Sequence, residues 1–257
     1  MTAGGSGDRP RLPPVYRLVP LERVDSTNDE AKRLAQAGAE DGTLVWAREQ
    51  RKGRGRQGRS WASPAGNLYL SLVLRPDCTP GDAAQLGFVA ALALGDAIGS
   101  VAPPMIEVQF KWPNDILLNG RKGAGILLES KIVDGTMEWL VLGIGVNVEA
   151  YPKDLEPPAT SLRFEGAPGD VTAVRLLEAF GPHFMSRVNR WLDDGFAPIR
   201  RSWLNHAYGL GEPIGVDLPR ERIEGRFKDL DESGTLIVEL PDGGTRRVAA
   251  GDVYRLG

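Results

Sequence analysis

Four apolar, strand-like segments follow one another between residues 107 and 148, separated by very short turns. The segments read EVQFKW, ILLN, GAGILLE and MEWLVLGIGVNV, and the turns between them contain Pro-Asn-Asp, Asn-Gly and Asp-Gly. Asn-Gly and Asp-Gly are the dipeptides that tight hairpin turns prefer, because both central residues must adopt positive φ. The pattern therefore predicts four consecutive strands joined by tight turns.

Further elements are expected on both sides of this block. VYRLVPLERV, GTLVWAREQ and NLYLSLVLRP are typical of strands. In DSTNDEAKRLAQAG, Thr27 as N-cap and Glu30 three residues later predict a helix that begins with a capping box. Three more helices are expected at residues 79–100, 170–191 and 197–207, from Thr79-Pro80 at the first start and from apolar spacing in the second.

The sequence also indicates how the chain divides. Residues 1–14, MTAGGSGDRPRLPP, lack the apolar core of a signal peptide and are expected to form a disordered tail. Residues 15–208 would form the main domain. From residue 209 to 257, short strands alternate with Gly-rich turns, which predicts a small all-β barrel.

Composition excludes several classes of function. The net charge of -3 and the pI near 5.6 give no bulk attraction to nucleic acid or to an anionic membrane. One cysteine, Cys78, allows no intramolecular disulfide, and His183 and His206 lack metal-ligand spacing. We expect no segment with the roughly 20 apolar residues of a membrane span. A reducing, cytoplasmic compartment is the expectation.

A dense basic run, RKGRGRQGRSW at residues 51–61, contains a GxGxxG pattern at Gly53, Gly55 and Gly58. A dinucleotide fingerprint needs a strand before these glycines and a helix after them, but here the run leads into another strand. A kinase glycine loop does lie between two strands, yet the chain contains no HRD or DFG motif. Both families are therefore excluded.

Two interpretations of the basic run stay open: a solvated or nucleic-acid-binding loop, and a polyphosphate-binding loop. The interleaved glycines let backbone N–H groups approach an anion closely. With no carboxylate in the run, the like charges are expected to repel and hold the loop open until a polyphosphate orders it. Five cations occupy nine residues: Arg51, Lys52, Arg54, Arg56 and Arg59.

Three companion motifs favour the second interpretation. KWPND places Lys111 at the end of a strand, where Pro113 and the residues after it form a turn. DSTN, at residues 25–28, offers donors at a helix start, although an N-cap alone also explains it. In GIGVN, Gly143 and Gly145 imply close backbone approach within a strand.

Together these motifs closely resemble the biotin protein ligases, whose signature is GRGRxGRxW. This chain reads GRGRQGRSW from residue 53, and KWPND, DSTN, GIGVN and ATSL (residues 159–162) stand in the family's order. The resemblance extends from Val15 to the C-terminus. It implies an α+β fold with a mixed β-sheet backed by helices, as in class II synthetases and lipoate ligases, and a C-terminal SH3-like β-barrel.

The resemblance also implies two half-reactions. Biotin and MgATP would give biotinyl-5'-AMP and pyrophosphate, and the adenylate would then acylate a lysine of a biotin carboxyl carrier domain. Joining a carboxylate to an α-phosphate requires positive charge where the two anions meet. Lys111 is a compact cation suited to bridge them, and Arg54, Arg56 and Arg59 can add forked donors. Mg²⁺ would bind through the phosphates, with no metal site built by the protein alone.

Site residues follow by matching the family's motifs. The implied catalytic residues are Lys111 and Arg56. Asp115 would orient Lys111 or Mg²⁺, although turn formation explains it equally well. The glycine loop is Gly53, Gly55 and Gly58. The implied biotin contacts are Ser26, Thr27, Asn28, Gln50, Arg54, Gly55, Arg56 and Lys111. The implied adenylate contacts are Arg56, Arg59, Trp61 (which would cover the adenine) and Asn147.

The expected partner is a biotin carboxyl carrier protein or domain of a biotin-dependent carboxylase. About fourteen residues precede the first strand, so we expect a monofunctional ligase without the N-terminal DNA-binding domain of some family members. The family often pairs through its central sheet, which leaves a homodimer open. Two alternatives remain: a lipoate or octanoate ligase on the same fold, and a nucleic-acid-binding protein that uses the basic run, against which the acidic pI argues.

Overall fold

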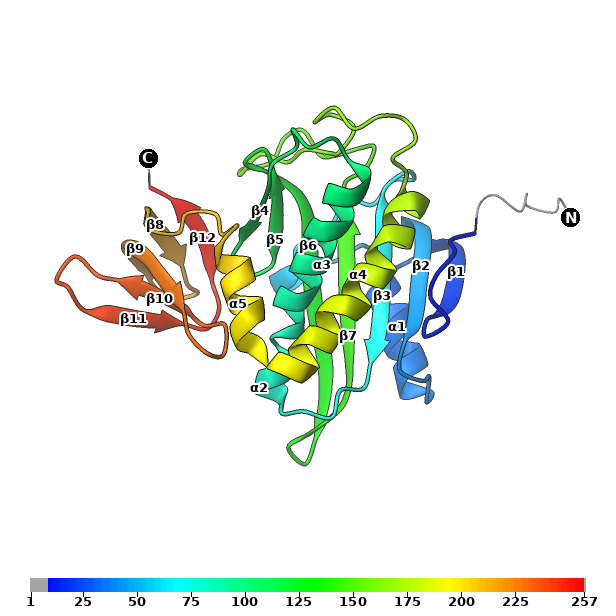
Figure 1. The fold of residues 1–257 in the computed structure, drawn as a ribbon, viewed down its shortest axis with the longest axis horizontal. Helices are drawn as coiled ribbons and strands as arrows, with labels where there is room; N and C mark the ends of the chain where they lie inside the picture. The colour runs from blue at the N-terminus through cyan, green and yellow to red at the C-terminus, as the bar shows by residue number, and fades with distance from the viewer. Residues whose placement is uncertain (1–8, 257) are drawn as a thin grey trace, which may run out of the picture.

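A seven-stranded mixed sheet forms the centre of the molecule in the computed structural model, which describes residues 9–256 (Figure 1). The strand order is β1-β2-β3-β7-β6-β5-β4. β1 and β2 are parallel, and the other neighbours in this sheet are antiparallel. The strands are β1 (Arg17–Val24), β2 (Thr43–Gln50), β3 (Leu68–Leu74), β4 (Val108–Lys111), β5 (Asp115–Leu118), β6 (Arg121–Val133) and β7 (Thr136–Val146).

The four strands expected between residues 107 and 148 are confirmed as β4 to β7. The turns between them have the predicted chemistry, because both residues of each dipeptide adopt positive φ. Asn119 and Gly120 have φ of 49° and 78°, and Asp134 and Gly135 have φ of 50° and 80°. These turns join β5 to β6 and β6 to β7 as antiparallel hairpins.

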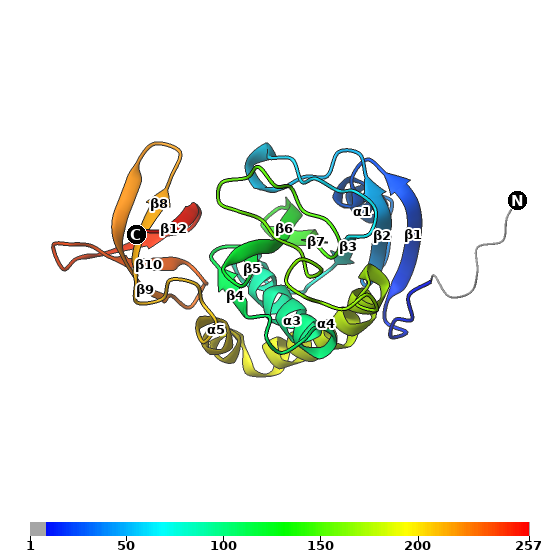
Figure 2. The same ribbon diagram turned by 90° about the horizontal axis from the view of Figure 1, so that it is seen from above.

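Helices cover both faces of this sheet. Figure 2 shows α3, α4 and α5 on one side and α1 on the other. Strand residues alternate between the two cores: Leu44 packs on the α3–α4 side, and its neighbour Val45 packs against Ala31 and Ala35 of α1. The helices are α1 (Thr27–Gln36), α2 (Pro80–Ala83), α3 (Leu86–Val101), α4 (Ala173–Asp194) and α5 (Phe196–Leu204), with the 3-10 turn η1 (Arg56–Gly58).

The start of α1 differs from the prediction by one residue. Ser26 is the N-cap: it has extended backbone angles, and its Oγ accepts from the backbone N of Asp29 at 3.4 Å. Thr27, predicted as the cap, is the first helical residue. Its hydroxyl faces Gln50 and Ser71 instead, so it is available to the functional site described below.

A second, smaller sheet packs beside the first. Its antiparallel strands lie in the order β11-β10-β9-β8-β12. The turn before β10 reaches into the main core, where the buried Trp112 Nε1 donates to the carbonyl of Gly234 at 3.1 Å. The apolar interiors of both sheets form one continuous cluster. The strands are β8 (Pro213–Asp217), β9 (Arg222–Leu230), β10 (Leu236–Glu239), β11 (Thr245–Val248) and β12 (Asp252–Arg255).

The expectation that no segment is apolar and long enough to span a membrane is wrong by length and composition. Pro80–Val101 has 22 residues and a mean hydropathy of 1.5 in its most apolar window, but 61% of that window is buried inside the protein. Small residues such as Ala90 and Ala93 let this segment pack tightly against the sheet and α4. It is a core helix of the fold.

Candidate active site

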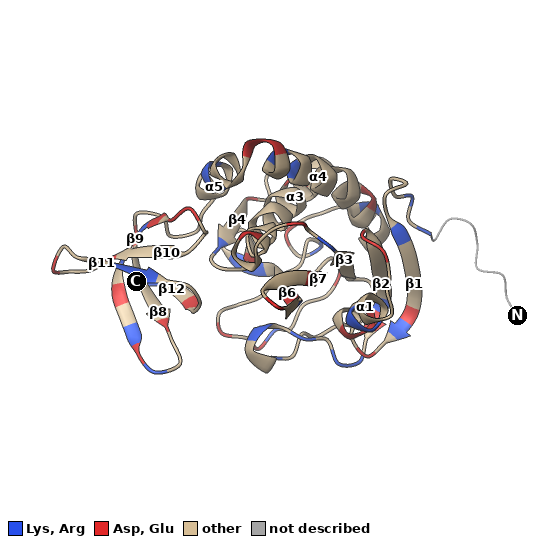
Figure 3. Ribbon diagram, turned by 90° about the horizontal axis from the view of Figure 1, so that it is seen from below, with Lys and Arg blue, Asp and Glu red and all other residues tan. Residues whose placement is uncertain are grey.

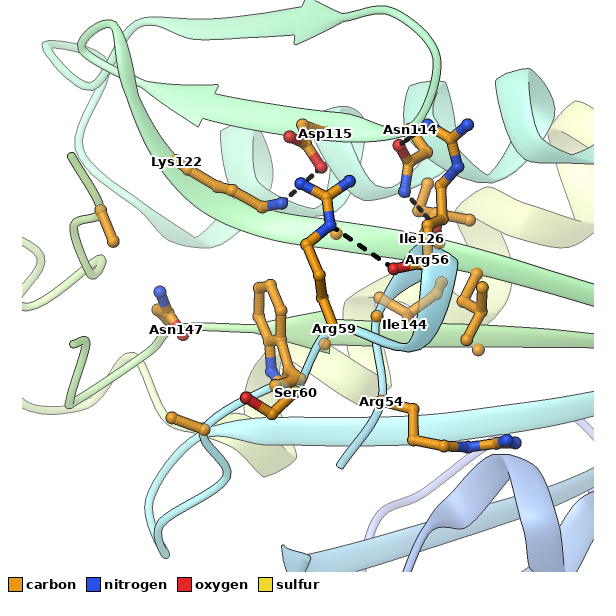
Figure 4. Close-up of a pocket in the computed structure, with 18 of the residues that line it drawn as sticks. Arg54, Arg56, Arg59, Ser60, Asn114, Asp115, Lys122, Ile126, Ile144 and Asn147 are labelled. Carbon is orange, nitrogen blue, oxygen red and sulfur yellow. Dashed lines mark hydrogen bonds and ion pairs between the residues drawn. The ribbon is translucent and has the colours of Figure 1, made fainter. Parts of the chain in front are cut away.

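A cavity of about 230 Å³ lies on the α1 side of the main sheet (Figure 4). Its walls come from the start of α1, the basic loop after β2, the turn between β4 and β5, strands β6 and β7, the segment 152–159, and β12 of the second sheet. The structure brings together residues that are up to 226 positions apart in the sequence, from Ser26 to Asp252. The predicted site residues that line it are Ser26, Thr27, Asn28, Gln50, Arg54, Gly55, Arg56, Arg59, Trp61 and Asn147.

A network of uncharged polar side chains forms one wall. The backbone N and the hydroxyl of Thr27 both donate to Gln50 Oε1, at 2.8 and 3.0 Å. Gln50 Nε2 in turn donates to Ser63 Oγ at 2.9 Å. The buried Ser71 Oγ lies 2.5 Å from Asn28 Oδ1 and 2.8 Å from Thr27 Oγ1. These contacts fix donors and acceptors in one orientation before any ligand arrives.

Glycines on β7 make room for two of these groups, as the GIGVN motif predicted. A Cβ on Gly143 would lie 2.0 Å from Asn28 Oδ1, and a Cβ on Gly145 would lie 2.6 Å from Trp61 Nε1. The Trp61 indole also lies next to Gly125 of β6, where a Cβ would come within 3.3 Å of the ring. The aromatic ring therefore lies directly on the backbone of two strands.

The basic run folds as a small hairpin. Gly55 N donates to Arg59 O at 2.7 Å, and Trp61 N donates to Gly53 O at 2.9 Å. A Cβ on Gly53 would come within 2.5 Å of Trp61 O, and Gly58 has φ of 74° at the tip, so two of the glycines are required by the backbone itself. Figure 3 shows the Lys and Arg residues along this connection between β2 and β3.

The prediction that unpaired like charges hold this loop open is wrong, because carboxylates far away in the sequence reach its cations. Arg54 Nη2 donates to Asp29 Oδ1 at 2.7 Å. Arg59 Nη2 donates to both carboxylate oxygens of Asp252, at 2.9 and 3.0 Å. Arg56 instead donates to Asn114 Oδ1 at 3.1 Å. Burial lowers the pKa of Arg56 despite the nearby carboxylates.

Lys122, which the sequence analysis did not assign to the site, lines the cavity. Its Nζ lies 2.7 Å from Asp115 Oδ1 and 5.5 Å from the centroid of the Trp61 ring (Figure 4). Lys111 pairs with Asp115 across the β4–β5 ladder and does not line the cavity. Burial lowers the pKa of Lys111. It also lies within electrostatic range of the cavity, because the charges of Asp115 and Lys122, which line the cavity, shift its pKa in opposite directions.

The arrangement suits a ligand that carries both an apolar part and several negative charges. Cations and the amide of Asn114 line one side of the cavity, and the indole of Trp61 and the side chain of Leu127 line another. Within residues 9–256 no cluster of three or more His, Cys, Asp or Glu side chains could hold a metal ion.

Two sequence families match the chain in succession. Residues 57–205 match the biotin/lipoate A/B protein ligase family, and residues 209–256 match the biotin protein ligase C-terminal domain. A biotin–[acetyl-CoA-carboxylase] ligase from Paracoccus denitrificans is 45% identical over 239 residues, which cover 91% of this chain and 98% of that protein. This chain belongs to the biotin protein ligase family. An enzyme of the same name from Mycobacterium tuberculosis is 35% identical over 92% of this chain and 88% of its own length.

Solved structures of biotin protein ligases confirm the predicted fold class. The Aquifex aeolicus enzyme in complex with biotin and ATP superimposes with a TM-score of 0.77 and 27% identity, and the match covers 93% of this chain and 99% of that chain. The mixed sheet backed by helices and the SH3-like C-terminal domain are therefore those of a biotin protein ligase.

Sequence reasoning missed three charged residues at or beside the cavity. Lys122 follows the Asn-Gly turn in RKGAG. Gly123 and Gly125, just after it, are the same sign of close backbone approach on β6 that the glycines of GIGVN are on β7. Asp252 lies 193 positions from Arg59, and no local pattern could pair them. Glu129 ends the predicted strand GAGILLE and carried no motif.

Proposed function

We propose that this biotin protein ligase activates biotin with ATP and transfers it to a carrier protein. Family membership supports this function, as does the likeness to a relative solved with biotin and ATP. The observation that carries the proposal is that a fixed polar network adjoins Lys122, Arg56 and Arg59 in one cavity. Such a cavity can hold a neutral ureido ring and a polyphosphate at the same time.

We propose that the polar wall binds biotin. Thr27, Asn28 and Gln50 present hydroxyl and amide groups to the N–H and C=O groups of the ureido ring, and the close approach at Gly143 makes the fit tight. Ser26, Arg54, Gly55 and Arg56 complete the proposed set of contacts.

The nucleotide is proposed to lie against the hairpin. Arg56 and Arg59 would hold phosphate oxygens, Trp61 would cover the adenine, and Asn147 would lie beside it. Lys122 would bridge the biotin carboxylate and the α-phosphate, with Lys111 behind it as a further positive charge. Mg²⁺ accompanies ATP as a phosphate complex, and the carboxylate of Asp115 is the group that could join it.

The cationic residues then act by placing positive charge beside the reacting groups. A biotin carboxylate oxygen attacks the α-phosphorus and pyrophosphate leaves; the amine of the carrier lysine later attacks the acyl carbon, loses a proton, and AMP leaves. Lys122, Arg56 and Arg59 stabilise the negative charge that gathers on the phosphoryl oxygens in the first step. The hairpin and the indole exclude water from the mixed anhydride.

Pyrophosphate release from MgATP tests the proposal, measured with biotin, with lipoate, with octanoate and with no acid added. Release that depends on biotin, with biotinyl-AMP retained on the protein, is the expected result. Release that depends only on lipoate or octanoate would keep the fold and refute the substrate.

The finer points of partner and location follow from the same proposal. We propose that the acceptor is a biotin carboxyl carrier protein or domain, that the protein acts in the cytoplasm, and that residues 15–208 form the ligase domain and 209–257 the SH3-like domain. The net charge of -3 supports the proposal that it does not bind DNA, which a gel-shift titration at low salt would test. Sedimentation with and without biotin would test for a homodimer.

A further inference from the structure

Glu129, on β6, receives hydrogen bonds from three side chains beside the proposed biotin site. Its Oε2 accepts from Asn28 Nδ2 at 2.8 Å, and its Oε1 accepts from Lys32 Nζ at 2.9 Å. Arg54 Nη2 donates to Glu129 Oε2 at 3.0 Å and lies 3.2 Å from Glu129 Oε1. The carboxylate is therefore shared by the helix that carries Asn28 and by the hairpin that carries Arg54.

The contact with Asn28 decides which way its amide points. An ionised carboxylate only accepts hydrogen bonds, so the NH2 of Asn28 must face Glu129 and its Oδ1 must face the other way. That oxygen accepts from Ser71 Oγ at 2.5 Å and lies over Gly143 at the cavity wall. A flipped amide would bring its oxygen against the carboxylate, which is unfavourable. Glu129 thus fixes the acceptor that Asn28 presents.

The contact with Arg54 ties down the hairpin. Asp29 also holds this guanidinium, and Lys32 lies 3.0 Å from Asp29 Oδ1, so two cations and two carboxylates form a closed cluster. Burial alone would raise the pKa of Glu129, but hydrogen bonds from Lys32 and Asn28 and the charge of Arg54 outweigh burial and lower the pKa. The group is therefore ionised at neutral pH.

We propose that Glu129 is a positioning residue for biotin, acting through the amide of Asn28 and through the anchor on Arg54. The inference rests on the proposed function and deepens it. Glu129 makes no contact with the cations proposed for the nucleotide, whose partners are different: Asp115 for Lys122 and Asp252 for Arg59. A change at Glu129 should therefore weaken biotin binding more than ATP binding, which is affected only through the looser anchor of the hairpin.

The test compares Glu129→Ala and Glu129→Gln with the wild-type enzyme. Pyrophosphate release gives the KM for biotin, the KM for ATP and kcat, and tryptic digestion without substrates gives the rate of cleavage after the hairpin arginines. We expect Glu129→Ala to raise the KM for biotin about tenfold, the cost of losing a hydrogen bond to a charged group. Glu129→Gln should raise it less, because its amide oxygen still accepts from Asn28. Both should speed cleavage, and the KM for ATP should rise less than the KM for biotin.

A control variant separates this role from general stability. Glu138→Gln, on the neighbouring β7, removes the 2.7 Å ion pair with Lys131 outside the cavity, and it should leave both KM values and the cleavage rate unchanged. Circular dichroism and the melting temperature check that each variant folds. An unchanged KM for biotin in folded Glu129→Ala, or an equal rise of both KM values, would overturn the proposal. Failure of the wild type to release pyrophosphate with biotin would instead refute the proposed function.

Discussion

Replacement of Lys122 by alanine is expected to slow the formation of biotinyl-AMP far more than the same change at Lys111. Lys122 Nζ lies inside the cavity and 2.7 Å from Asp115 Oδ1, whereas Lys111 does not line the cavity. Lys111 lies on β4 and Lys122 on β6, the strands on either side of β5, so they form a matched pair of variants with the same change in charge.

The magnitude follows from the contacts that Lys122 is proposed to make. One bond to the biotin carboxylate and one to the α-phosphate, at about 1.5 kcal/mol each for charged partners, amount to about 3 kcal/mol. Each 1.36 kcal/mol is tenfold in rate, so the loss should be roughly 150-fold. The side chain of Asp115 is only 16% exposed and would lose its partner, which adds repulsion toward the phosphates. Lys111→Ala removes only a more distant charge, and we expect a loss below about tenfold.

The assay is a single-turnover measurement of biotinyl-AMP formation with excess enzyme, which isolates the chemical step from product release. The double variant Lys122→Ala/Asp115→Asn should recover part of the rate, because it removes the unpaired carboxylate. A larger loss for Lys111→Ala than for Lys122→Ala would refute this reasoning and return the bridging role to Lys111.

Three further predictions follow from the packing and the charges. Gly145→Ala would place a Cβ 2.6 Å from Trp61 Nε1. Because overpacking costs about 1–3 kcal/mol, the indole should move and the KM for ATP should rise. An unchanged KM for ATP would contradict the placement of the adenine. The lowered pKa of Glu129 means that its ionised form stabilises the fold above the ordinary value of 4.5 and that this contribution is lost as the pH falls through the lower folded-state pKa. The difference in free energy of unfolding between wild type and Glu129→Gln, measured with urea, should therefore shrink below pH 4.5, and a difference that widens there would be inconsistent with the shift. Trp112→Phe leaves the carbonyl of Gly234 buried without its donor, so urea unfolding should show a loss of about 1–3 kcal/mol; wild-type stability would show that this contact does not hold the second sheet in place.

The fold could be predicted wherever short-range chemistry decides the structure. The dipeptides at residues 119–120 and 134–135 adopt positive φ, and they join β5 to β6 and β6 to β7 as hairpins. The glycines at 143 and 145 likewise predicted close approach without naming the groups that approach. The N-cap was misplaced by one residue because the capping-box spacing to Glu30 favoured Thr27, although Ser is the better cap in isolation. In the fold the hydroxyl of Thr27 contacts Gln50 and Ser71 instead.

The charge pattern of the site could not be predicted, because it depends on partners that meet only in the fold. The basic hairpin contains no carboxylate, yet Asp29, Glu129 and Asp252 reach it from a helix, a central strand and the last strand of the chain. The choice between Lys111 and Lys122 has the same origin. Both lie near Asp115, and only the arrangement of β4, β5 and β6 decides which of them reaches the cavity.

Mass spectrometry of a purified biotin carboxyl carrier domain, incubated with this protein and MgATP, tests the central claim most directly. With biotin present, we predict that one biotinyl group is added to one lysine of the carrier domain, and that no addition occurs without ATP. With lipoate in place of biotin, the mass of the carrier should stay unchanged. An unmodified carrier in the presence of both biotin and MgATP, with folded protein, would contradict the assignment of this cavity to biotin transfer.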